Sequence, residues 1–268
     1  RHSAGLGKSP TEKDPDIYDH RNIHFDVLVV GAGISGILAA KNAAKNNLKT
    51  LLIDEKSELG GATIYQNREF NKIDNQSSSD WIKKEINELK NINNLEVKTR
   101  TSVAAYHGYN YLLARENLTD HLEKKDKNNK VRQRLLKIRA KKVILATGAL
   151  ERPLIFNNND RPGIMLSTAV KKYADFFGVK CGKKNVFFTN NDSAYESALC
   201  LYNKGIKVDA IVDIRDNSNS KIVKAVEQAG IKIYWSHTVV DTNGYRRLSN
   251  ISIMRLSNDG MTVTGKRI

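Results

Sequence analysis

Apolar and polar stretches follow one another in the same order twice along this chain. Residues 25–30 are apolar except for Asp26, and a helical pattern rich in Ala extends to about residue 46. Residues 49–53 then end on the apolar residues Leu51, Leu52 and Ile53. The same order returns between residues 184 and 212. Continuously apolar strands on either side of a helix are typical of a βαβ unit, whose parallel strands are covered on both faces. The pattern predicts an α/β fold with two Rossmann-like units, each built of a strand, a helix and a strand.

The pattern changes between these two units. Residues 79–92 carry apolar side chains, among them Trp81, at helical spacing, and residues 95–101 read as a third parallel strand. Short two-sided strands then indicate an antiparallel β-meander inserted at about residues 102–140. The predicted domains are a linker at 1–23, a first dinucleotide-binding domain at 24–160 and a second Rossmann-like domain at 161–268.

The last part of the chain is predicted to extend the second domain. A helix is expected at residues 221–229, a strand at 231–235 and an antiparallel pair near 247–256 and 261–268. Because the sequence starts with Arg1 rather than Met and stops within a strand pattern, we expect a piece of a longer polypeptide, truncated before the chain returns to its first domain.

The first apolar strand ends on the turn G-A-G-I-S-G, whose candidate cofactor contacts are Gly31, Gly33, Ile34, Ser35 and Gly36. The first glycine permits the tight turn, the second lets the backbone approach a diphosphate, and the third lets helix and strand pack closely. The following helix N-terminus offers free N–H groups and a partial positive charge. The turn therefore predicts a bound dinucleotide.

An acidic residue, Asp54, closes the second strand of this unit, with Glu55 beside it. A carboxylate there can accept hydrogen bonds from an adenosine ribose and repels a 2′-phosphate, which favours NAD or FAD over NADP. The pair Gly60 and Gly61 is expected to carry the chain back over the diphosphate. Residues 62–66 contain no cysteine, which argues against thiol–disulfide chemistry at this site.

A second fingerprint follows the buried strand at residues 142–145. It is the small-residue turn formed by Ala146, Thr147 and Gly148, which lets a strand end approach a cofactor closely. Its combination with the glycine turn favours the FAD/NAD-linked reductase fold.

The second unit lacks the glycines. Thr189, Asn191 and Ala194 stand at the three glycine positions. Asn tolerates left-handed dihedrals, so the turn can persist, but Cβ atoms crowd the place of a diphosphate. The sequence favours a unit kept for its structure over a second nucleotide site.

Composition limits the other classes of function. The net charge is +15, but Lys is spread along the chain without an interleaved aromatic pattern, so we expect no nucleic-acid partner. No apolar run reaches the roughly 18 residues of a membrane span. Cys181 and Cys200 have no metal-ligand spacing, which favours a reducing cytoplasm. We identify no metal ligands and no catalytic residues.

Several longer stretches closely resemble the α subunit of heterotetrameric sarcosine oxidases. They are DVLVVGAG, LLIDEKSELGG, RQRLLKIRAKKVILATGALERPL, NNDRPGIM and FTNNDSAYESAL, and the resemblance covers nearly the whole chain from about Gly5. The α subunits of that family also carry a ferredoxin-like N-terminal module and a folate-binding C-terminal module. Both are absent here, so the chain resembles the central portion.

The resemblance implies an enzyme complex that oxidises sarcosine to glycine, formaldehyde or methylene-tetrahydrofolate, and hydrogen peroxide. It implies NAD on the Rossmann module, held by Gly31, Gly33, Gly36 and Asp54, with FAD as the alternative at this site. It also implies β, γ and δ partner subunits, with FAD and sarcosine on β and a covalent FMN near the α/β contact. The isolated chain is expected to be inactive.

Three other interpretations remain open on the sequence. The chain could be an α subunit of a related amino-acid or opine dehydrogenase complex, a self-contained NAD(P)H-dependent flavoprotein reductase, or a non-catalytic scaffold that holds a nucleotide. The turn at Thr189 and Asn191 and the missing cysteines argue against the reductase.

Overall fold

The computed structural model describes residues 11–65, 72–123, 126 and 129–268. The described residues form two compact units. The first contains those up to Ile64 and those of Asp80–Gly148, and the second contains those of Tyr65–Ser79 and Ala149–Ile268. The sequence places the boundary later, after residue 160.

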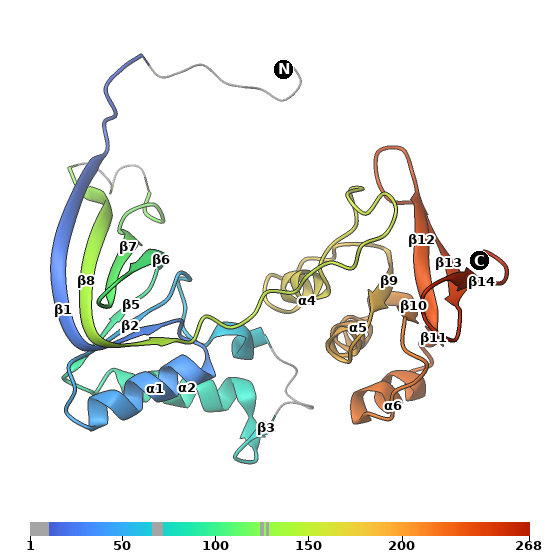
Figure 1. Ribbon diagram of the computed structural model, residues 1–268, viewed down its shortest axis with the longest axis horizontal. Coiled ribbons are helices and arrows are strands. Elements are labelled where there is room, and N and C mark those ends of the chain that lie inside the picture. The colour runs from blue at the N-terminus through green and yellow to red at the C-terminus, as the bar shows by residue number, and fades with distance from the viewer. Residues whose placement is uncertain (1–10, 66–71, 124–125, 127–128) are drawn as a thin grey trace. The chain divides into compact units, whose positions relative to one another are not determined.

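The first unit is built on a six-stranded sheet with the order β5-β2-β1-β8-β7-β6 (Figure 1). Its strands are β1 (Ile17–Val30), β2 (Thr50–Ile53), β5 (Leu95–Lys98), β6 (Thr101–His107), β7 (Tyr111–Asn117) and β8 (Val131–Leu145). Strands β5, β2, β1 and β8 are parallel to one another. Strands β7 and β6 continue the sheet beyond β8 in antiparallel pairing. The predicted combination of a parallel sheet and an antiparallel meander is confirmed.

Two strands of this sheet are longer than the sequence predicts. Residues 17–23, assigned to a linker, belong to β1, which pairs with β8 from Ile17 to Val30. The end of the predicted meander and the separate strand expected at residues 142–145 are one strand, β8. The additional residues of β1 are mostly polar, and a side chain of β8 binds one of them. Arg134 donates from Nε and Nη2 to the two carboxylate oxygens of Asp19, at 2.8 and 3.0 Å. The rest of the linker, residues 1–10, lies outside the described residues.

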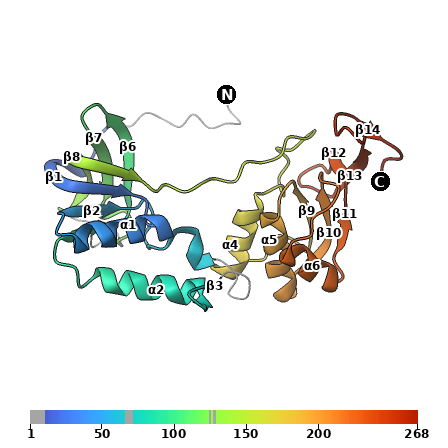
Figure 2. The ribbon, with the colours of Figure 1, turned by 60° about the horizontal axis from the view of Figure 1, so that its bottom comes forward.

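Two helices complete the first unit. Helix α1 (Ile34–Lys45) contacts β1, β2, β5 and β8, and α2 (Ser78–Leu89) lies beside it (Figure 2). Lys41 on α1 pairs with Glu85 on α2 at 2.6 Å. The helical spacing predicted for residues 79–92 is confirmed by α2, whose Trp81 is buried at 7% exposure. Between the two helices in sequence lie the 3-10 turn η1 (Gly61–Tyr65) and the hairpin strands β3 (Lys72–Ile73) and β4 (Gln76–Ser77). The hairpin belongs to the second unit.

The second unit has three layers. Helices α4, α5 and α6 lie on one side of a parallel sheet with the order β11-β10-β9, and an antiparallel sheet lies on the other side (Figure 1). The helices are α4 (Ser167–Asp175), α5 (Ser193–Asn203) and α6 (Lys221–Gln228). The strands are β9 (Lys184–Thr189), β10 (Lys207–Asp213), β11 (Lys232–Tyr234), β12 (His237–Asn243), β13 (Asn250–Leu256) and β14 (Val263–Thr264).

The sequence misses two elements of this unit. The first is helix α4, whose N-cap residue makes no side-chain cap bond. The second is β12, which is the main partner of β13, whereas the sequence pairs residues 247–256 with 261–268. That expected pair exists only as the short contact between β13 and β14. None of the helices in the described part of the chain is long and apolar enough to cross a membrane.

Candidate dinucleotide-binding site

The glycine turn lies where β1 ends and α1 begins. Gly33 is the N-cap of α1, with φ −75° and ψ −172°, and no side chain that the structure describes caps this helix end. The first turn of α1 also carries no acidic residue. The helix N-terminus therefore retains N–H groups and a partial positive charge for an external anion.

Two of the three glycines are required by the fold itself. Gly31 has φ +97°, and a Cβ there would collide with the carbonyl oxygen of Ala146. A Cβ on Gly36 would collide with the carbonyl oxygen of Gly31 and would lie 3.3 Å from the Cβ of Ala146. These contacts hold the start of α1, the turn and the end of β8 against one another.

Gly33 is different, because nothing in its own unit requires a glycine there. Its φ is one that any residue adopts, and a Cβ would meet no atom within 4 Å. The open space at Gly33 adjoins the uncapped N-terminus of α1. The two features together fit a diphosphate, which needs close backbone approach and N–H donors at the same point.

Asp54 lies at the end of β2 and is nearly buried, at 9% exposure. Its Oδ2 accepts the backbone N–H of Ala32 at 2.7 Å, and its Oδ1 accepts that of Lys56 at 2.8 Å. The carboxylate thus fixes the second residue of the glycine turn, a role that the sequence analysis missed. Glu55, the next residue, is exposed.

The Gly-Gly segment returns to the turn. The N–H of Gly60 donates to the carbonyl of Ala32 at 2.7 Å, and a Cβ on Gly61 would lie 2.9 Å from the Cα of Gly33. Both glycines have positive φ, +112° and +59°. The pair therefore borders the open space beside Gly33.

The A-T-G turn lies at the neighbouring strand end. The N–H of Ala146 donates to the carbonyl of Val30 at 2.8 Å, which places Ala146 beside the first glycine of the turn. Thr147 and Gly148 are exposed, and Gly148 has φ +72°. The structure thus places the two turns, Asp54 and the Gly-Gly pair at one edge of the first sheet. Ile34 is half-buried and Ser35 exposed in the first turn of α1.

Within the described residues, no group of three or more His, Cys, Asp or Glu side chains could hold a metal ion. Cys181 is exposed and Cys200 is buried, and both are free thiols. Burial raises the pKa of the Cys200 thiol, which makes it a poor nucleophile at neutral pH.

Comparisons with known proteins agree with this geometry. Residues 28–263 match the family model described as pyridine nucleotide-disulphide oxidoreductase. The chain is 39% identical over 257 residues, 95% of its length, to the sarcosine oxidase subunit alpha of Corynebacterium sp. (strain P-1). It is 34% identical over 266 residues, 97% of its length, to that of Rhizobium meliloti (strain 1021). In both cases it spans 26%, about a quarter, of the relative's length.

Solved structures show the same fold. The thioredoxin reductase of T. acidophilum has a TM-score of 0.62 at 18% identity, covering 91% of this chain and 74% of that one. The L-proline dehydrogenase from P. horikoshii has a TM-score of 0.59 at 22% identity, covering 87% of this chain and 39% of that one.

Proposed function

Since the chain belongs to the pyridine nucleotide-disulphide oxidoreductase family, we propose that it is the dinucleotide-holding part of the α subunit of a sarcosine oxidase-like complex. The similarity to two such α subunits over nearly the whole chain supports the complex. One observation carries the dinucleotide: the space at Gly33, which no atom of the unit fills, adjoins a helix N-terminus without a side-chain cap.

We assign NAD to this site, with FAD as the alternative. The N–H groups at the start of α1 hold the diphosphate, and Gly33 leaves it room. Asp54 holds the turn through Ala32 and presents a carboxylate to the adenosine ribose, with Glu55 as a second acidic group beside it. When bound, a nicotinamide or flavin dinucleotide supplies a hydride acceptor or donor.

In this proposal the reaction belongs to the assembly. Sarcosine, O2 and water give glycine, formaldehyde and hydrogen peroxide on a flavin carried by the β subunit. With tetrahydrofolate present, the one-carbon unit leaves as methylene-tetrahydrofolate instead of formaldehyde. An FMN lies near the α/β contact, and γ and δ complete the heterotetramer. We place the complex in the cytoplasm, in keeping with the free thiols of Cys181 and Cys200.

The test is to purify the full-length subunit with its β, γ and δ partners and to identify the nucleotides released on denaturation. We expect one adenine dinucleotide per α chain in addition to the FAD carried by β, and sarcosine-dependent formation of peroxide. Proline and an opine serve as comparison substrates. Faster turnover of either, without sarcosine oxidation, would assign the complex to the related dehydrogenases instead. An α chain free of dinucleotide would overturn the site.

A further inference from the structure

The second unit repeats the strand, turn, helix and strand of the first at a turn without glycines. β9 ends at Thr189, α5 begins at Ser193 and β10 ends at Asp213. Asp213 is the last residue of the second strand of its unit, and Asp54 directly follows the second strand of the first unit. The two units can therefore be compared position by position.

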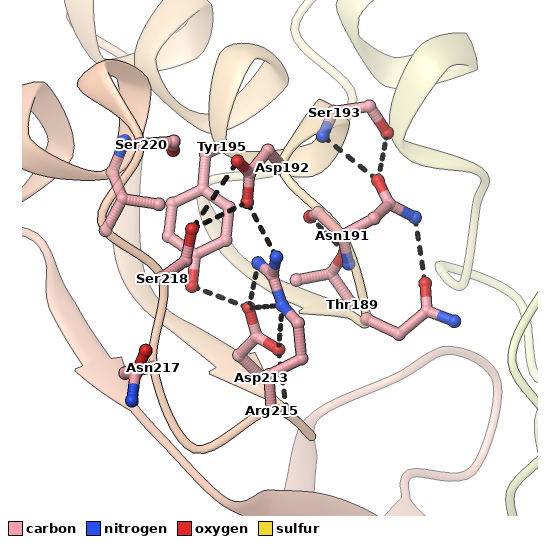
Figure 3. A network of polar contacts seen from close by, with 12 residues as sticks. Thr189, Asn191, Asp192, Ser193, Tyr195, Asp213, Arg215, Asn217, Ser218 and Ser220 are labelled. Atoms are coloured by element: carbon pink, nitrogen blue, oxygen red, sulfur yellow. Dashed lines mark hydrogen bonds and ion pairs between the residues drawn. The ribbon is translucent and has the colours of Figure 1, made fainter.

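Two backbone N–H donors of this second turn are already bonded to side chains. The side-chain oxygen of Asn191 accepts the N–H of Ser193 at 3.0 Å and its hydroxyl at 2.5 Å (Figure 3). The hydroxyl of Thr189 accepts the N–H of Asn191 at 3.1 Å and donates to the carbonyl of the same residue at 2.9 Å. The side chain of Asn191 thus bonds the first N–H of α5, although the N-cap residue Asp192 makes no side-chain cap bond itself. At α1 no described side chain bonds the helix start.

Asp213 is likewise committed within its own unit. It is fully buried, and its Oδ2 accepts the hydroxyl of Tyr195 at 2.8 Å, while its Oδ1 accepts the N–H of Arg215 at 2.9 Å. Burial, reinforced by Asp213, raises the pKa of Tyr195, so the hydroxyl stays protonated as a donor. In the first unit Ile37 stands at the place of Tyr195 and has no group to donate. Asp54 bonds the turn backbone instead.

Arg215 joins the two ends of this turn. Its guanidinium pairs with Asp213 through NH2 at 2.7 Å and with Asp192 through NH1 at 2.8 Å (Figure 3). Asp192 directly precedes α5. Burial raises the pKa of Asp192, but hydrogen bonds from Ser220, Arg215 and Ser218 outweigh it and hold the carboxyl below its ordinary value. A charged carboxylate therefore stands at the helix end where a diphosphate would have to lie.

We propose that Asp192, Asp213 and Arg215 form a clamp that takes the place of a dinucleotide in the second unit. The carboxylate of Asp192 is the anion at the N-terminus of α5, and Arg215 binds the acid that would otherwise accept a ribose. A diphosphate entering this turn would meet like charge at Asp192 and the side chain of Asn191.

The clamp has a consequence for electron transfer. A chain with one dinucleotide site cannot pass a hydride from a nicotinamide on one unit to a flavin on the other. This argues against the self-contained NAD(P)H-dependent reductase. If the proposed function holds, on which this step rests, the redox partner of the nucleotide is carried by another chain.

The first test needs no variant. The nucleotide in the first site of the full-length subunit is released from one sample and counted, and a second, loaded sample is titrated calorimetrically with NADH, NADPH and FAD. We expect no further saturable binding below about 1 mM. A second site with micromolar affinity would overturn the clamp. An empty first site would instead count against the proposed function, so the two failures are distinguishable.

The second test removes the cation. Arg215→Ala leaves two acidic side chains without their shared partner, so the thermal midpoint of the second unit should fall by about 5 °C or more. Lys56→Ala is the matched control, because Lys56 follows Asp54 as Arg215 follows Asp213 and contributes its backbone N–H to the acid. The control should shift the midpoint by less than about 2 °C. Equal midpoints for the two variants would show that Arg215 does not hold the turn.

Discussion

The backbone N–H of Ala32 donates to Oδ2 of Asp54 over 2.7 Å, across 22 residues of sequence. The acid at the end of β2 is thus part of the turn's own structure as well as a candidate contact for a ribose. The chain's own atoms make this hydrogen bond, and holding a turn in place in this way lowers the entropy cost of binding a ligand there.

This contact predicts a stability effect that does not depend on nucleotide. Asp54→Ala leaves the buried N–H of Ala32 without its acceptor, so the free energy of unfolding of the nucleotide-free protein should fall by about 1–3 kcal/mol. Urea unfolding of stripped protein measures it. Glu55→Ala is the control, because Glu55 is exposed. If Asp54 served the ribose alone, stripped Asp54→Ala protein would unfold like the wild type.

Because Gly33 borders open space and Gly36 does not, substitutions at the two positions should have different effects. One should affect nucleotide binding and the other stability. Gly33→Val fills open space, so the sheet should form while bound nucleotide drops sharply. Gly36→Ala forces a Cβ onto the carbonyl oxygen of Gly31 and should lower the thermal midpoint. Nucleotide released per folded chain and circular dichroism on heating separate the two effects. Wild-type nucleotide content in folded Gly33→Val would remove the diphosphate from this turn.

We expect Glu151 to make a pH-dependent contribution to the stability of the second unit. Its carboxylate accepts the backbone N–H and hydroxyl groups of Ser167 and Thr168, at 2.6–3.0 Å, and so caps α4. Burial raises the pKa of Glu151, but these hydrogen bonds outweigh it and hold the pKa below the ordinary 4.5. The stabilisation is therefore present above that ordinary value and is lost as the pH falls through the lower, folded-state pKa.

The corresponding variant is Glu151→Gln. At pH 7 it should lower the free energy of unfolding by about 1–2 kcal/mol, and the difference from wild type should shrink as the pH falls below about 4. Glu227→Gln, at an exposed position of α6, is the control and should match the wild type at both pH values. A Glu151 difference that stays constant down to pH 2.5 would mean that charge plays no part in the cap.

Residues 1–268 alone should have no amine oxidase activity. Hydride removal from an amine requires a flavin ring at contact distance from the substrate carbon, and the proposal places both on a partner subunit. The purified chain supplied with FAD, FMN or NAD should form neither peroxide nor reduced cofactor from sarcosine. Adding the partners to the full-length subunit should restore turnover. Turnover by residues 1–268 alone above about 1 per second would refute the division of roles.

Local patterns in the sequence were enough for the repeated units. The strand, helix and strand predicted between residues 184 and 212 are present as β9, α5 and β10, because apolar runs and helical spacing are properties of short segments. The glycine turn could also be predicted from the sequence. Gly31 and Gly36 are required by close backbone contacts that any Rossmann turn of this kind makes.

Tertiary structure decided what depends on partners distant in sequence. The polar start of β1 becomes a strand only because β8 pairs with it and Arg134 meets Asp19 there. Helix α4 draws its cap from Glu151, far upstream of its own start. The sequence predicted a second turn crowded by Cβ atoms, but only the folded unit brings Arg215 between two acids. Side-chain pairing across elements leaves no periodic signal, so such contacts emerge only once the strands and helices are packed.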